Sequence, residues 1–138
     1  MFIHPSEIKT HLLDYQVDQI TNGDESIVIS AIDAAVAEVK SYISSRFDSD
    51  AIFSLSGKDR SPLILVHVKN IAVWNLLRLS NVDAIYDRYR DAYNDSISFL
   101  SKVADGSLVP DLPYRQSPDG NPPGTLQISS NPKFTHNF

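Results

Sequence analysis

Four histidines are the residues best suited to acid–base or metal chemistry, but their spacing favours neither. They are His4, His11, His67 and His136. None belongs to an HExxH motif or stands three or four residues from a second histidine, the spacing that places two metal ligands on one helix face. His67 lies in an apolar stretch, where it is either a buried base or an ordinary hydrogen-bonded histidine, and we expect the second. The chain has no cysteine, which excludes disulfides, thiolate nucleophiles and cysteine-ligated zinc.

A row of carboxylates offers a second candidate for chemistry. The row consists of Asp83, Asp87, Asp91 and Asp95. On a helix this spacing of four makes one ridge, which could bind a divalent cation or a basic partner. Like charges at this spacing destabilise a helix by about 0.2–0.5 kcal/mol per pair, and Arg88 and Arg90 stand close enough to offset much of that. We therefore expect a solvated outer face and no metal.

Aromatic residues and loop motifs leave the search for an active site empty. Tyr86, Tyr89 and Tyr93 could stack nucleotide bases, but their spacing is that of an inward helix face, and no basic groove accompanies them. Asp48 and Asp50 lack the correctly placed glycine and glutamate of a calcium loop. No serine stands in a G-x-S-x-G context, and there is no glycine-rich phosphate loop. The sequence predicts no enzyme and no cofactor.

The charge distribution is unfavourable for gripping nucleic acid. Net charge is −5; residues 1–60 carry five Lys or Arg against ten Asp or Glu, while residues 61–138 carry seven of each. Proteins that hold DNA usually show a basic stripe, because neutralising phosphates drives affinity through counterion release. We expect any contact with DNA to be non-specific and weak.

The elements that carry these residues are helices. Ser6 to Leu13 reads as a short opening helix, and Asn22-Gly23 marks a turn. Asp24 and Glu25 then favour a helix start, and an apolar stripe of period 3.6 predicts a long helix over 24–47. The stripe comprises Val28, Ile32, Ala35, Val39, Tyr42 and Ile43. Residues 48–60, with a glycine and five charges, are predicted to be a loop.

Two further long helices follow. Ser61-Pro62 is a favourable helix start, and residues 62–80 are apolar nearly all round, which is typical of a central helix. Trp74 lies in its middle, so we expect it in the core and a Trp74→Ala change to cost about 3–5 kcal/mol. Asn81 or Asp83 would cap the helix over 82–105, and Gly106 would end it. No stretch approaches the roughly 18 uninterrupted apolar residues of a membrane span, and no signal peptide is expected.

The C-terminal segment differs in character. Six of the eight prolines fall in residues 110–132, so residues 107–138 should be an extended arm beside a helical domain of residues 1–106. The arm still holds apolar residues that would be wasteful in a linker: Tyr114, Leu126, Ile128, Phe134 and Phe138. We expect these five to be assembly contacts. The alternative is that the arm packs on its own domain.

A series of short motifs in fixed order resembles a known family. They are Ile20-Thr21-Asn22-Gly23-Asp24, Ile43-x-x-Arg46-Phe47, Pro62-Leu63, Ile71-Ala72, Leu77-Arg78, Arg88-Tyr89-x-x-Ala92 and Phe99-Leu100-x-x-Val103-Ala104-x-Gly106-x-Leu108. Over roughly residues 2–112 the chain resembles the helical head–tail connector, or head-completion, proteins of tailed bacteriophages and prophages, particularly the small Mu-type group. The motifs consist of core and capping residues, so the likeness lies in their order and spacing.

The resemblance implies a subunit of a homo-oligomeric ring beneath the portal, extending the channel through which DNA leaves the head. Such a subunit would contact the portal protein above and a tail-completion protein below, with no catalytic residue, cofactor or membrane. It would occupy the bacterial host cytoplasm during assembly and the virion neck afterwards. The alternative is a small helical protein-binding or regulatory adaptor with no phage role. For fold, we expect an all-α bundle of three long helices plus a short N-terminal helix.

Overall fold

The structure is a computed structural model of the 138-residue chain, and it describes residues 1–10, 12, 14–79 and 86–116. Its three long helices are α2 (Glu25–Ile43), α4 (Pro62–Leu77) and α5 (Tyr86–Asp105). Shorter elements precede and join them: the 3-10 helices η1 (Pro5–Thr10) and η2 (Gly57–Asp59), and the α-helices α1 (Asp14–Thr21) and α3 (Ser49–Ser54). The described residues contain no β-strand beyond one isolated bridge, so the predicted all-α bundle of three long helices is confirmed.

Helix α2 begins and ends through local polar contacts. The Asp24 side chain accepts a hydrogen bond from the Ser26 backbone N–H at 3.0 Å, which satisfies one of the free donors at the helix start. Five residues of the predicted stripe, Val28, Ile32, Ala35, Val39 and Ile43, are each at 3% exposure or less, and the sixth, Tyr42, is half-buried. The helix stops at Ile43, four residues before the predicted end, and a turn leads to Phe47.

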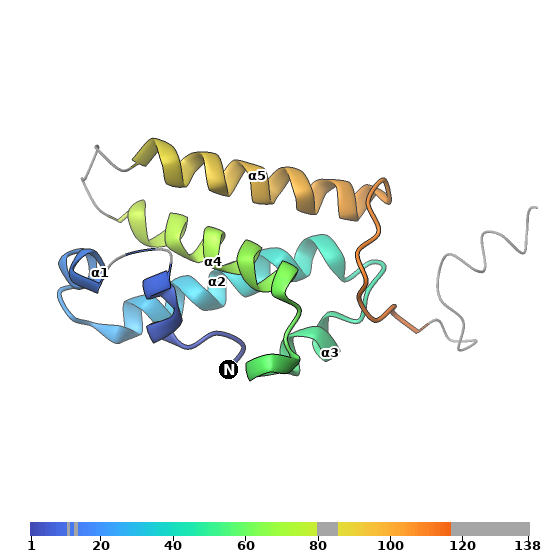
Figure 1. Cartoon of the computed structure of the whole chain (residues 1–138), viewed down its shortest axis with the longest axis horizontal. Helices are drawn as coiled ribbons and strands as arrows, with labels where there is room; N and C mark the ends of the chain where they lie inside the picture. Colours follow the sequence, from blue (N-terminus) through green and yellow to red (C-terminus); the bar gives the residue numbers. More distant parts are fainter. Residues whose placement is uncertain (11, 13, 80–85, 117–138) are drawn as a thin grey trace, which may run out of the picture.

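Helix α4 is the central element, as its apolar composition predicts. The Ser61 hydroxyl accepts from the Ile64 N–H at 3.4 Å, and Pro62 occupies the first turn, where its missing donor costs nothing. The helix packs against both α2 and α5, which also contact each other (Figure 1). Ile64, Val68 and Ile71 are fully buried, each contributing about 1.5–3 kcal/mol of burial free energy.

Helix α5 runs antiparallel beside α4 and ends at Gly106. Leu100 and Val103 face the core, and Gly106 takes φ +85°, the left-handed conformation that ends many helices and that glycine adopts most easily. The predicted caps at Asn81 and Asp83 lie outside the described residues. None of the described helices is long and apolar enough to cross a membrane.

Two short helices lie where the sequence indicated none. Residues 48–60 were predicted as a loop, but α3 forms there because the Asp48 side chain accepts from the Ala51 N–H at 3.1 Å. Ile52 is buried, and the Phe53 ring lies 4.8 Å from that of Phe2. Helix α1 occupies the residues before the Asn22 turn, and its Val17 and Ile20 pack against the core. Tertiary burial at both helices, together with the Asp48 cap at α3, outweighs a weak local pattern.

Candidate assembly site

His67, a candidate for acid–base chemistry, takes part in the packing between two helices. His67 Nδ1 lies 2.8 Å from Ser96 Oγ, which also accepts from Asn70 Nδ2 at 3.0 Å, and the imidazole stacks on Phe99 at 4.2 Å. Burial lowers the pKa of His67, so the ring is held neutral between α4 and α5. His67 is therefore the hydrogen-bonded boundary histidine that the sequence favoured.

The aspartate ridge is a solvated face along its described length. Asp87, Asp91 and Asp95 are exposed, and Asp83 lies outside the described residues. Arg90 pairs with Asp87 at 3.4 Å and approaches Asp91 at 3.9 Å. Such exposed pairs contribute little to stability. Within the part of the chain that the structure describes, no three His, Asp or Glu side chains gather as metal ligands would.

Tyr89 and Tyr93 of α5 pack against the core, as their spacing predicts, and the Tyr86 side chain lies outside what the structure describes. The Tyr93 ring stacks on Trp74 at 5.5 Å, and its hydroxyl donates to Glu38 Oε1 at 3.3 Å. Burial, reinforced by the Glu38 charge, raises the pKa of Tyr93. Tyr89 is half-buried beneath the Arg88 guanidinium. Trp74 itself is half-buried, which is less than the core position predicted for it.

A short antiparallel pairing fastens the chain after α5. We call residues 107–116 the strap. The Asp48 N–H donates to the Pro113 carbonyl at 2.9 Å, and the Arg115 N–H donates to the Arg46 carbonyl at 2.9 Å. These two bonds make Phe47 and Tyr114 a bridge pair, and their rings stack at 5.2 Å. The strap thus closes on the turn after α2, two segments that no local sequence pattern connects.

The strap is also held by apolar burial and by its entry from α5. Leu112 is 8% exposed and joins the core, and Pro110 is buried. At Gly106 a Cβ atom would lie 2.5 Å from Arg46 Nη2, so the guanidinium lies directly over the glycine. The strap therefore packs against the helices of its own chain.

The predicted assembly residues are placed only in part. Tyr114 is 45% exposed, with one ring face on Phe47 of its own chain and the remainder open to solvent. The other four, Leu126, Ile128, Phe134 and Phe138, lie outside the described residues. Their role in assembly, and the division of the chain into residues 1–106 and 107–138, stay predictions. The structure places the described chain as far as Gln116, with the strap beside the turn that follows α2 (Figure 1).

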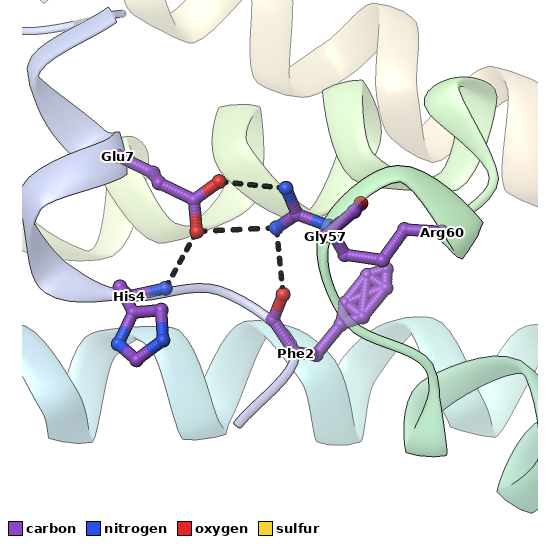
Figure 2. A network of polar contacts seen from close by, with 5 residues as sticks. All are labelled: Phe2, His4, Glu7, Gly57 and Arg60. Atoms are coloured by element: carbon purple, nitrogen blue, oxygen red, sulfur yellow. Dashed lines mark hydrogen bonds and ion pairs between the residues drawn. The ribbon is translucent and has the colours of Figure 1, made fainter.

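A polar network that the sequence did not reveal holds the N-terminal segment (Figure 2). Arg60 Nη2 donates to Glu7 Oε1 at 2.8 Å, and Nη1 donates to Glu7 Oε2 at 3.1 Å and to the Phe2 carbonyl at 2.8 Å. Arg60 Nε donates to the Gly57 carbonyl at 2.8 Å, and the His4 N–H donates to Glu7 Oε2 at 2.8 Å. The hydrogen bond from Arg60 is the main cause that lowers the pKa of Glu7.

This network positions apolar residues at the end of the bundle. Phe2 and Ile3 are buried, and the Arg60 guanidinium lies 5.9 Å from the Phe2 ring centroid. Glu7 and Arg60 are separated by 53 positions, so neither spacing nor period could have connected them. The sequence offered one weak signal for this network, the residue type at position 60. An arginine directly before the cap of α4 at Ser61 can pair with a carboxylate that is distant in the sequence.

Comparison with known proteins gives one match. Residues 3–127 match the family model described as "Bacteriophage Mu, Gp36". The matched range includes α1 to α5, the strap and most of the Glu7–Arg60 network. No curated protein and no solved structure matches the chain.

Proposed function

This chain belongs to the Bacteriophage Mu, Gp36 family, a family of Mu-type phage proteins, and within that setting we propose that it is a structural subunit of the head–tail connector. Copies of the chain form a ring that extends the portal channel, through which DNA passes without specific binding. The ring contacts the portal protein on one side and a tail-completion protein on the other. The subunit is not an enzyme and uses no cofactor.

One observation carries this proposal: the strap is fixed to the turn after α2 immediately before a segment whose composition suits binding to a partner. The Phe47–Tyr114 pair holds the strap in place. The residues that follow carry Leu126, Ile128, Phe134 and Phe138 between prolines and glycines. Such a segment cannot build its own core, but it can bury those side chains on a partner, as arms that order on binding do.

The charges of the described surface support passage of DNA better than its retention. The exposed side of α2 presents Asp24, Glu25 and Asp33, and that of α5 presents Asp87 and Asp95. A wall with excess negative charge does not release counterions from DNA and so does not hold the duplex. This supports a channel or neck protein, present in the host cytoplasm during assembly and in the virion neck afterwards.

The proposal is tested by assembly with the portal protein of the same phage. The full chain and a chain ending at Gln116 are each mixed with purified portal rings and examined by sedimentation and electron microscopy. We expect the full chain to add a ring to the portal and the truncated chain to add none while keeping its melting temperature. Failure of the full chain to bind portal rings would refute the connector role.

The position of that truncation follows from the strap. Ending the chain after Gly106 would also remove Leu112, which is buried, and the Tyr114 ring that covers Phe47. Burial of a leucine contributes about 1.5–3 kcal/mol, so a chain ending at Gly106 should lose stability whether or not the arm serves assembly. Ending it after Gln116 removes only the segment proposed to bind the partner.

A further inference from the structure

One face of α4 is covered along its second half and open along its first. Val66, Val73 and Leu77 are spaced by seven and four residues, so they point to the same side of the helix. Val73 and Leu77 are 1% and 3% exposed, whereas Val66 is 46% exposed. Leu63, one turn before Val66, is 42% exposed. We call Leu63 and Val66 the open face of α4.

The open face is flanked by elements that bury the other sides of the same turns. His67 stacks on Phe99 of α5, and Ile64 is fully buried. At this level the neighbours of α4 cover Ile64 fully and His67 in part, whereas Leu63 and Val66 are exposed. Two large apolar side chains adjoining on one helix turn make a small apolar patch of the kind that interaction sites use.

The open face lies in the same half of the molecule as the strap (Figure 1). That half holds the start of α4, the end of α5 and α3, as the His67–Phe99 contact between the antiparallel helices requires. It also holds three other exposed apolar residues, Leu55 at 39%, Val109 at 58% and Tyr114 at 45%. Leu79, 65% exposed, lies at the opposite end of α4.

We propose that the open face of α4 receives residues 117–138 of a second copy of this chain. The segment begins where the strap ends, and its four large apolar residues match an apolar patch in chemistry. It carries one aspartate and one lysine and therefore no net charge, so seating it against valine and leucine buries few charges. The strap directs the chain toward the turn at residues 44–48, where Arg115 reaches the Ser44 carbonyl at 3.4 Å.

The choice of a second copy rests on the proposed ring, in which each subunit lies beside another. An arm that leaves one subunit and seats on the next makes a head-to-tail contact, the type that closes into rings. Each subunit then contributes one segment of residues 117–138 and one open face, so a closed ring leaves neither of them unpaired.

Disulfide trapping in the full chain tests this directly, because the natural chain contains no cysteine. A Val66→Cys protein and a tagged Ile128→Cys protein are mixed and oxidised gently. We expect a disulfide between the two chains. A Leu79→Cys protein replaces Val66→Cys as the control, since Leu79 is 65% exposed but lies at the opposite end of α4, and it should give little cross-linked product. Equal yields from Val66→Cys and Leu79→Cys would overturn the proposal.

A double Val66→Cys/Ile128→Cys protein distinguishes the two sources of the arm. If it closes a disulfide within one chain while the mixture gives none between chains, the arm covers its own domain and the proposal fails.

Charge variants give a second readout. Val66→Asp should weaken self-association about tenfold or more, the loss expected when an apolar interface contact is replaced by a carboxylate, with an unchanged melting temperature. Leu79→Asp, the same kind of change at the other end of α4, should leave self-association as it was; equal effects of the two would contradict the proposal.

The outcome is independent of the connector role. Portal binding by the full chain without the Val66–Ile128 cross-link would refute only the docking site. The cross-link without portal binding would support the docking site and refute the connector.

Discussion

Removing the charge of Glu7 should destabilise the fold by a measurable and pH-dependent amount. In Glu7→Gln the side chain keeps one acceptor oxygen, but an NH2 group replaces the second. That NH2 would face the Arg60 guanidinium, donor against donor, where the carboxylate now accepts at 2.8 and 3.1 Å. The network shown in Figure 2 therefore loses one charge-assisted bond and its ionic attraction.

The magnitude follows from how far the pair is removed from water. The Arg60 and Glu7 side chains are 12% and 25% exposed. Exposed pairs contribute about 0–1 kcal/mol, and breaking a fully buried pair costs about 3–5 kcal/mol. For a pair mostly shielded but still touching solvent, we expect Glu7→Gln to lower the free energy of unfolding by about 2 kcal/mol at pH 7. This is a large part of the stability of a small domain.

The pH dependence has a definite sign. The hydrogen bond from Arg60 lowers the pKa of Glu7 below its ordinary value of 4.5, so the folded state favours the charged carboxylate. The stabilisation is fully present above that ordinary value and is lost as the pH falls through the lowered pKa of the folded state. Glutamine does not titrate. The difference in unfolding free energy between the natural chain and Glu7→Gln should be constant from neutral pH down to about pH 5.5 and shrink in more acidic solution.

Urea unfolding followed by circular dichroism, repeated between pH 7 and pH 3, measures this difference. Asp50→Asn is the matched control. It breaks the ion pair between Lys40 and Asp50, whose charged atoms lie 3.4 Å apart, but the Asp50 side chain is 93% exposed. We expect no measurable effect from it. A Glu7→Gln protein as stable as the natural chain, or a deficit that does not change with pH, would refute the role assigned to the network.

Three further predictions concern the core, the strap and the channel. Trp74→Ala should lower the free energy of unfolding by about 2–3 kcal/mol, less than the loss of a fully buried tryptophan, because Trp74 is half-buried and stacks on Tyr93. A loss below about 1 kcal/mol in urea unfolding would contradict that packing. Gly106→Ala should cost about 1–2 kcal/mol for its positive φ, about as much as Gly23→Ala, because the Arg46 guanidinium that the new Cβ meets is the far end of a flexible side chain and can move aside; a much larger loss at Gly106 in thermal melts would contradict this. The purified chain should not shift duplex DNA in a gel at physiological salt, and a salt-sensitive shift at micromolar protein would contradict a channel that lets DNA slide.

The features that could be read from the sequence are those with local causes. The stripe of α2, the caps at Asp24 and Ser61 and the stop at Gly106 each depend on residues within a turn or two of one another. A helix period and a capping side chain act over that range, so the sequence predicted three long helices close to their observed bounds. The same local logic placed His67, Tyr89 and Tyr93 against the core rather than in an active site.

The tertiary structure decided everything that joins distant segments. Helix α3 is anchored to the N-terminal segment by the Phe53–Phe2 contact, the strap closes because Tyr114 meets Phe47, and Arg60 finds Glu7 across 53 positions. None of these pairs has a periodic signature, since each depends on how the helices pack and where the chain turns. The exposure of Val66 beside buried Val73 and Leu77 is of the same kind: all three are apolar on one helix face, and only the positions of neighbouring elements determine which of them remains open to a partner.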